Sequence, residues 1–372
     1  MGTPRCRTRG PGPRPRPAET GERWVMSAKR RPTQVDVARL ARTSRQTVSL
    51  VVRDDPRVAP QTRSRVLSAM DELDYRPNIA ARALAAHNSR FIGIILVGIT
   101  NPFYADLCDA LRSRCEERGL IPLVAISGRH RDSCIVCAER LVHMGVEGLT
   151  VVSPPLGAED LDRIGTQVPT VLLTHNSGPG SVDLVHTDDE TGARMATRHL
   201  LENGFEPVAH LGYDRAIPGD SAGARRRGFL AEARRAGTEP LSVDLMTTTV
   251  EDAVRGLLRA HGPGIGFCCH NDLVALEVMR VLADRAPAGG HDHGITGFDN
   301  SRIASHPAIS LTSIDQRTAD LADAAVELLG ERIDGRTGQV DRVCAPTLVR
   351  RDSSRSRGTP DVGASPLAGN LS

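Results

Sequence analysis

Aromatic side chains and long apolar runs are scarce in this sequence of 372 residues. Only 3% of the residues are aromatic, and the single tryptophan, Trp24, lies near the start of the chain. The longest apolar run, Phe91 to Val97, is far shorter than the roughly 20 residues that cross a bilayer. Residues 1–25 contain no apolar segment of the kind that forms a secretory signal. These absences exclude a membrane-spanning or exported protein and indicate a cytoplasmic one.

Two phosphate-binding motifs of α/β enzymes are also missing. The sequence has no G-x-G-x-x-G after an apolar strand and no G-x-x-x-x-G-K-S/T. The glycine-rich segment 262–266, G-P-G-I-G, comes before an apolar strand and not after one. We therefore expect no enzyme activity, no catalytic residue and no cofactor.

Eight cysteines are present, and two of them, Cys134 and Cys137, have C-x-x-C spacing. A zinc site would need a second pair or two histidines at ligand spacing, and neither is nearby. A redox pair would need to follow a strand at the start of a helix, and that context is not evident. We predict that these cysteines are reduced and pack on a helix, and we expect no metal site.

The net charge of +2 hides two opposite charges. Residues 26–90 carry thirteen Lys and Arg against six Asp and Glu, a net +7, whereas residues 91–350 carry a net −10. Residues 1–25 add +4. An acidic body repels phosphate, so a basic segment joined to it indicates a separate part that binds a polyanion, nucleic acid before membrane.

Residues 32–76 predict three short helices that form a helix-turn-helix domain. Thr33 begins a capping-box pattern before the first helix, Ser44 can cap the second, and Pro60 falls in the first turn of the third. The apolar side chains expected in the core of this domain are Val35, Ala38, Leu40, Ala41, Val48, Val51, Val52, Val66, Leu67, Met70 and Leu73.

The acidic body alternates apolar runs with amphipathic or polar stretches, a pattern typical of parallel sheets covered by helices. About 260 residues exceed one doubly wound unit, so two lobes are expected. The apolar runs that predict strands are 91–97, 122–126, 148–152, 170–173, 208–211, 264–268 and 295–298.

Short motifs in both parts closely resemble the LacI/GalR family of bacterial transcription regulators. They cover about residues 32 to 352 and occur in the family's order. In the basic segment they are V-D-V-A-R-L-A (35–41), S-R-Q-T-V-S (44–49), T-R-S-R-V (62–66) and L-D-Y-R-P-N (73–78). In the body they are N-P-F-Y (101–104), D-D-E-T-G-A (188–193), H-L-L-E-N-G (199–204), R-R-R-G-F (225–229), N-D (271–272), G-F-D-N (297–300) and S-L-T-S-I (310–314).

The resemblance implies that the second helix lies in the major groove of double-stranded DNA. Arg45 and Gln46 at its start would read base edges, since Arg suits guanine and Gln suits adenine. The alternative for both is a solvated helix start. Leu50 stands where the family often has a second base-reading Arg, so it reaches at most a thymine methyl group. The remaining predicted DNA-contacting residues, as caps or phosphate ligands, are Thr33, Ser44, Thr47, Ser49 and Arg53.

Two further departures from the family pattern fall in this domain. Arg42 replaces a turn glycine at a position that can demand a positive φ, and Ala59 replaces a capping serine, a loss of about 1 kcal/mol. Arg42 can instead add a phosphate contact. We expect DNA binding to be weakened or retuned.

A hinge helix over residues 77–88 would fold on DNA, by the same resemblance. Two copies in a dimer would meet in the minor groove, where Asn78 and Ala81 lie beside Leu84, which wedges into the central base step. The alternative is a plain linker with Leu84 exposed. Off DNA the segment is too short to form a stable helix alone.

The resemblance also implies two Rossmann-like lobes that close on a small effector, as in periplasmic sugar-binding proteins. The first would hold residues 90–187 with 312–345 returning to it, and the second residues 188–311. Asn101 and Asp272 can instead cap helices, and Phe103 can be core. The effector contacts carried over from the family are Asn101, Phe103, Tyr104, Asp188, Arg225, Asp272 and Asp299.

Such carboxylates, guanidinium groups and aromatic rings suit a polyhydroxylated effector, a sugar or a nucleoside. The resemblance implies an α/β regulator, more often a repressor than an activator, that binds a palindromic operator as a homodimer. A ligand-binding protein without a DNA role is the alternative, but it would leave the basic segment unexplained. The amphipathic segment 317–332 serves either the dimer interface or the core.

We divide the chain accordingly. The change in composition after Ser27 suggests that translation starts at Met26. The end of the chain lacks the heptad leucines of a tetramerising coiled coil. The expected parts are an Arg- and Pro-rich disordered leader (1–31), the helix-turn-helix domain (32–76), the hinge helix (77–88), the effector-binding and dimerisation domain (89–352) and a disordered tail (353–372).

Overall fold

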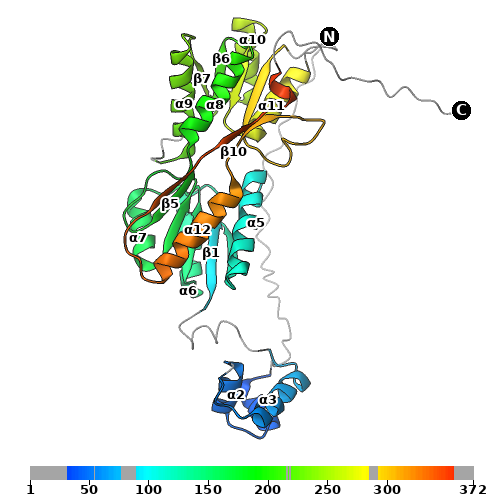
Figure 1. Cartoon of the computed structure of the whole chain (residues 1–372), viewed down its shortest axis with the longest axis vertical. Helices are drawn as coiled ribbons and strands as arrows, with labels where there is room; N and C mark the ends of the chain where they lie inside the picture. The colour runs from blue at the N-terminus through cyan, green and yellow to red at the C-terminus, as the bar shows by residue number, and fades with distance from the viewer. Residues whose placement is uncertain are drawn as a thin grey trace, which may run out of the picture. The chain divides into compact units, whose positions relative to one another are not determined.

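The computed structural model describes residues 32–53, 55–76, 89–214, 217, 219–284 and 292–355 (Figure 1). The expectations for the leader, for the hinge residues Asn78, Ala81 and Leu84, and for the tail beyond residue 355 lie outside the described residues. The chain divides into two compact units, Met1–Asn78 and Ile79–Ser372, and each is described by itself.

The first unit is the predicted three-helix domain. Thr33 and Asp36 form the capping box, with the Asp36 N–H donating to Thr33 Oγ1 at 3.4 Å. Arg42 adopts φ +49°, and Ala59 makes no side-chain cap, as both departures predicted. The helices are Gln34–Leu40 (α1), Arg45–Val52 (α2) and Pro60–Glu72 (α3).

The predicted core of this unit was wrong at three positions, Val35, Leu40 and Leu67, which are exposed. Adjacent residues of a helix lie about 100° apart, so on a helix with a single covered face Val66 and Leu67 point in different directions. Val66 takes the core position. The buried residues of this core that the sequence prediction missed are Val37, Val58, Ala69 and Tyr75.

The second unit contains two lobes, each built on a six-stranded sheet. In the first lobe all strands are parallel, in the order β11-β5-β4-β3-β1-β2. Helices α5 and α12 cover one face of this sheet, and α6 and α7 cover the other. The elements are Phe91–Leu96 (β1), Pro102–Glu117 (α5), Ile121–Ile126 (β2), Arg131–His143 (α6), Gly148–Val152 (β3), Ala158–Gln167 (α7), Thr170–Leu173 (β4), Asp183–Thr187 (β5), Thr318–Ile333 (α12) and Asp341–Cys344 (β11).

The sheet of the second lobe has the order β12-β10-β9-β8-β6-β7, with only β12 antiparallel to its neighbour. Helices α8 and α9 pack on one face, and α10 and α11 on the other. The elements are Asp189–Glu202 (α8), Val208–Gly212 (β6), Ser221–Arg235 (α9), Leu241–Asp244 (β7), Val250–His261 (α10), Gly266–Cys269 (β8), Asp272–Ala283 (α11), Gly294–Asp299 (β9), Thr312–Asp315 (β10), Thr347–Val349 (β12) and the 3-10 turn Asp352–Ser354 (η1).

The chain passes between the lobes three times, as expected, but one assignment was wrong. Residues 312–315 were placed in the first lobe, whereas β10 pairs with β9 and β12 in the second. The second passage therefore lies between β10 and α12. The first lies between β5 and α8, and the third between β11 and β12. All three meet in the narrow region between the lobes (Figure 1).

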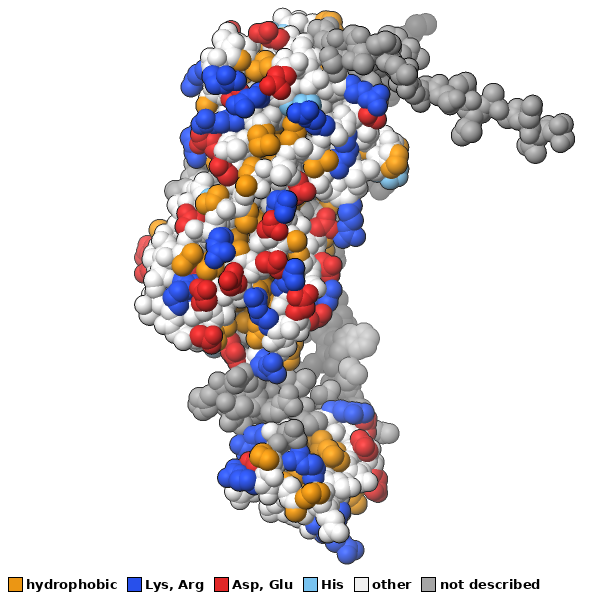
Figure 2. Space-filling model, in the orientation of Figure 1, with side chains coloured by type: hydrophobic (Ala, Val, Ile, Leu, Met, Phe, Trp, Pro, Cys, Tyr) orange, Lys and Arg blue, Asp and Glu red, His pale blue; other side chains and the backbone are white. Residues whose placement is uncertain are grey.

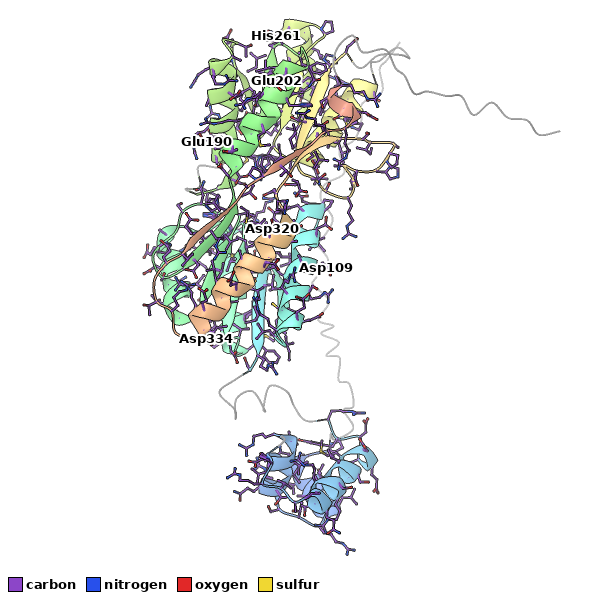
Figure 3. All side chains as sticks on the ribbon, in the orientation of Figure 1. Asp109, Glu190, Glu202, His261, Asp320 and Asp334 are labelled. Carbon is purple, nitrogen blue, oxygen red and sulfur yellow. The ribbon has the colours of Figure 1, made fainter. Side chains whose placement is uncertain are left out.

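Helix α12 belongs to the core of the first lobe. Its residues Leu321, Ala325, Leu328 and Leu329 are buried within a single chain, against α5 and the sheet. Figure 3 shows the two helices side by side, with Asp109 marking α5 and Asp320 and Asp334 marking the two ends of α12. Of the two alternatives left open for residues 317–332, core packing is confirmed.

Cys134 is buried in α6 and packs on the first lobe's sheet, beside Cys137. Burial raises the pKa of the Cys134 thiol to about 11, which makes it unreactive. Within the residues that the structure describes, no group of His, Cys, Asp and Glu is arranged to hold a metal ion. None of the described helices combines the length and apolarity that a membrane crossing requires.

Candidate functional site

The start of α2 presents polar side chains to solvent. Ser44 caps the helix by accepting the Thr47 N–H at 3.0 Å. Arg45 and Gln46 follow in the first turn and are exposed, whereas Val48 and Val51 on the opposite side are buried in the core of the unit. The cap therefore fixes the helix start, and the core fixes which face is exposed to solvent.

The rest of α2 differs from this exposed start. Arg53 donates from Nη2 to Ser49 Oγ at 3.3 Å, so one guanidinium and one hydroxyl lie together at the end of the helix. Thr47 is half-buried and shares a hydrogen bond with Ser44. Leu50 is also half-buried and packs against the core. Figure 2 shows Lys and Arg side chains on the visible surface of this unit.

A cavity of about 190 Å³ is lined by residues of both lobes. Its walls come mainly from loops that follow the carboxyl ends of parallel strands, where ligands bind in open α/β sheets. The polar residues among those that line it are Thr100, Asn101, Tyr104, Arg129, Ser153, Thr174, His175, Tyr213, Asp220, Ser221, Arg225, His270, Asn271, Asp299 and Gln316.

Asp299 joins the two lobes at this cavity. Asn101 caps α5 through its Oδ1 and donates from Nδ2 to Asp299 Oδ2 at 2.9 Å, while Gln316 Nε2 donates to Asp299 Oδ1 at 2.6 Å. Asp299 also adopts φ +113°, a strained conformation of the kind that concentrates at functional sites. Burial raises the pKa of Asp299, and the positive charge of Arg225 opposes that change.

Arg225 is held in place on three sides. Its Nε donates to Asp189 Oδ1 at 2.7 Å, its Nη1 donates to the His270 carbonyl at 2.7 Å, and its guanidinium lies 3.6 Å from the centre of the Phe298 ring. A guanidinium has five N–H donors in a fixed plane, so these contacts orient it while leaving donors for a ligand. Both Arg225 and Asp189 are buried.

Five of the seven predicted effector residues line the cavity: Asn101, Phe103, Tyr104, Arg225 and Asp299. Asn101 is a helix cap as well, and Phe103 is buried in the core of the first lobe, so the alternatives for these two also hold.

Asp188 and Asp272 do not line the cavity. Asp188 caps α8, accepting the Thr191 N–H at 2.9 Å. Asp272 is turned into the second lobe, where it accepts the Ser301 N–H at 2.7 Å and the Ser313 hydroxyl at 2.5 Å. Its neighbour Asn271 caps α11 and lines the cavity in its place.

Sequence reasoning missed His175, which follows β4 as Asn101 follows β1. The ring is buried and lines the cavity. Its Nδ1 lies 3.1 Å from the Ser177 carbonyl, which only accepts, so Nδ1 carries the hydrogen and Nε2 keeps its lone pair. Burial lowers the pKa of His175, which favours the neutral form of the ring. The position after a buried parallel strand was a signal that could have identified it.

Ser221 lies in a G-x-S-x-G sequence, G-D-S-A-G at 219–223. In α/β hydrolases this motif makes a sharp turn directly between a strand and a helix. Here residues 213–220 separate the end of β6 from Ser221, the first residue of α9. The cavity histidine His175 directs its Nδ1 to the Ser177 carbonyl at 3.1 Å and not to Ser221. The arrangement therefore lacks the features of a nucleophile elbow.

Comparison with known proteins identifies the family. Residues 33–78 match the family profile for bacterial regulatory proteins of the lacI family, and residues 197–354 match that of a periplasmic binding protein-like domain. GalR, a transcriptional regulator of Salmonella typhimurium, is 30% identical over 327 residues, which cover 86% of this chain and 94% of that protein. The chain belongs to the LacI family.

Two solved structures show the same fold as this LacI-family chain. The lac repressor dimer bound to operator and the anti-inducer ONPF is 25% identical, with a TM-score of 0.75 over 87% of this chain and 99% of that one. A complex of the transcriptional regulator CelR with cellobiose is 27% identical, with a TM-score of 0.62 over 87% of this chain and all of that one. The predicted family and fold class are confirmed. LacI-family proteins are DNA-binding transcription regulators and not enzymes.

Proposed function

We propose that this chain is a sequence-specific repressor whose affinity for a palindromic operator is controlled by a small polyhydroxylated effector, a sugar. One observation carries the proposal: a capped, solvent-exposed helix start in a basic unit is joined in one chain to a two-lobed cavity lined with paired hydrogen-bonding groups. The relation to the lac repressor, solved on its operator, supports it. The protein would act in the cytoplasm and catalyse no reaction.

On the DNA side, Arg45 and Gln46 would read base edges, and Thr33, Ser44, Thr47, Ser49 and Arg53 would position the unit on phosphates. Gln46→Ala should cost about 1 to 3 kcal/mol of operator binding and relax the preference at one base pair. Gln61→Ala is the matched control, because Gln61 is exposed at the start of α3. Equal operator affinity of the two variants in gel-shift titrations would contradict the reading role of Gln46.

The hinge residues Asn78, Ala81 and Leu84 remain part of this proposal. Leu84→Ala should lose much of the operator preference and keep weak, salt-sensitive binding, because the wedge adds specificity and the basic residues add non-specific affinity. Unchanged specific affinity in a gel-shift titration would refute the wedge.

On the effector side, the cavity offers acceptors and donors suited to neighbouring hydroxyl groups. Asp299 and His175 Nε2 accept, Asn101, Asn271 and Arg225 donate, and Tyr104 supplies an aromatic face. Thermal unfolding with a panel of sugars and nucleosides tests this side directly. A sugar should raise the midpoint of the wild-type chain and not that of Arg225→Lys, while a panel without any effect would contradict the sugar assignment.

A homodimer would cover an apolar edge of the first lobe. Strand β2 ends the sheet, and its Val124 and Ile126 side chains are 50% and 52% exposed. An exposed, apolar edge strand is a liability unless another chain covers it. Val124→Asp should produce monomers in sedimentation experiments. Met246→Asp, at an exposed position in the second lobe, should leave the dimer intact.

A further inference from the structure

The two lobes also touch through their main chains, away from the three passages of the chain between them. Residues 175–177 of the first lobe follow β4, and residues 219–220 of the second precede α9. The Asn176 N–H donates to the Gly219 carbonyl at 2.9 Å, and His175 and Asp220 form an isolated antiparallel bridge. Because this contact is made by main-chain groups, it requires the two segments to approach as closely as neighbouring strands do.

Gly219 is the residue that permits this approach. It adopts φ +82°, in the left-handed region that favours glycine. A Cβ atom at this position would lie 2.8 Å from His175 Nδ1 and 3.0 Å from the Ser177 main-chain nitrogen, and closer still to Ser177 Oγ. A side-chain end can rotate away, but the main chain of Ser177 can withdraw only if its segment shifts away from the second lobe.

The contact is part of the cavity wall, since both His175 and Asp220 line the cavity. Side chains join the lobes elsewhere, with Asn101 bonded to Asp299 and Asp106 paired with Arg302. These side chains can exchange partners with a ligand or with water, whereas the contact at Gly219 forms only when the lobes are close together.

We propose that residues 175–177 and 219–220 form a clasp that holds the lobes together over the cavity, and that the absence of a side chain at Gly219 allows it to close. That the molecule in the cavity is an effector rests on the proposed function, but the clasp itself does not. Opening of the clasp would control how fast a molecule enters or leaves the cavity, and its strength would set the balance between open and closed lobes.

Hydrogen exchange of the full-length protein tests the clasp without ligand or DNA, so its failure is distinct from failure of the proposed function. The readout is the Asn176 amide, resolved by mass spectrometry with fragmentation. In the wild-type chain this amide should exchange at least about 100-fold more slowly than an unstructured amide. Gly219→Ala should accelerate its exchange by about tenfold or more, because the N–H loses its acceptor when the segments separate.

Gly204→Ala is the matched control. Gly204 has φ +81°, nearly the same as Gly219, but a Cβ there would meet nothing within 4 Å. This variant therefore adds the same backbone strain without a cross-lobe collision, and exchange at Asn176 should stay within about twofold of the wild type. The amides of β3 report whether each variant is folded.

Three results would overturn the proposal: an unprotected Asn176 amide in the wild type, unchanged protection in folded Gly219→Ala, or equal acceleration in Gly204→Ala. If the β3 amides of Gly219→Ala also exchange rapidly, the variant is unfolded. The proposal then stands or falls on whether the Asn176 amide is protected in the wild type.

Discussion

His210 should make the stability of the second lobe depend on pH. It lies in the middle of β6, is buried, and stacks on Phe229 with ring centroids 5.4 Å apart. Neither ring nitrogen has a hydrogen-bond partner among the described residues. Burial, followed by the positive charges of Arg226 and Arg225, lowers the pKa of His210 to about 4 from an ordinary value of 6.5.

The size of the effect follows from the difference between the pKa of His210 in the unfolded chain, 6.5, and in the folded chain, about 4. Between pH 6.5 and about 4 the unfolded chain takes up a proton that the folded chain does not, so the unfolding free energy falls as the pH falls through this window. At about 1.4 kcal/mol per pKa unit the loss reaches roughly 3 kcal/mol near pH 4. Above pH 6.5 the ring is neutral in both states and the loss disappears.

Urea unfolding of the wild type and of His210→Leu at a series of pH values between 7.5 and 4.5 measures this effect. The variant should be at least as stable as the wild type at pH 7.5, because two unpaired buried nitrogens are removed, and it should lose less stability on acidification. Other groups, among them the buried His175 and His199, titrate in both proteins and cancel in the difference. His143→Leu, at an exposed position on α6, should keep the wild-type slope. Parallel curves for the wild type and His210→Leu would refute the reasoning.

Three further substitutions have expected outcomes. Arg225→Met should lower the unfolding free energy by about 3 kcal/mol or more, because Asp189 stays buried without its cation. The double variant Arg225→Met/Asp189→Leu should recover most of this loss. Equal losses of unfolding free energy in the single and double variants, measured by urea titration, would contradict a stabilising role for the buried pair. Ala59→Ser should raise the stability of the helix-turn-helix unit by about 1 kcal/mol by capping α3, a gain that hydrogen exchange of α3 amides would detect. Arg42→Gly should stabilise the same unit by up to about 1 kcal/mol, because it removes the backbone strain of a non-glycine residue at φ +49°. If Arg42 contacts a phosphate, the variant should also lower the slope of log affinity for DNA against log salt concentration by about one. An unchanged melting curve would contradict the strain argument.

The fold was predictable where side-chain patterns report burial. All seven predicted apolar runs are strands, because parallel strands covered on both faces read as continuous apolar segments. Strand β5 was missed because it contains Asp183, whose carboxylate is buried and paired with Arg332 and Arg336, both more than 140 residues away. Such a partner is invisible to a local pattern, and the charge alone argued against a buried strand.

The site was predictable to the level of its loops and less so to the level of side chains. Asn101, Arg225 and Asp299 meet at the cavity as expected, since Asn101 follows β1 of the first lobe, while Arg225 lies early in α9 and Asp299 ends β9 in the second lobe. Asp272 does not, because its serine partners, Ser301 in the loop after β9 and Ser313 in β10, turn it inward. The direction of a carboxylate at a helix start depends on neighbours distant in sequence, so spacing could not separate Asp272 from Asn271.

Binding-site selection by the full-length protein, without and with sugars, tests most directly whether one chain joins operator reading to effector control. The account predicts enrichment of one palindromic site and at least one sugar that changes the affinity for it, with the preference relaxed in Gln46→Ala. Two results would contradict the account. One is that the selection recovers no common sequence. The other is that a sugar raises the thermal midpoint of the protein but no sugar changes its affinity for the selected site.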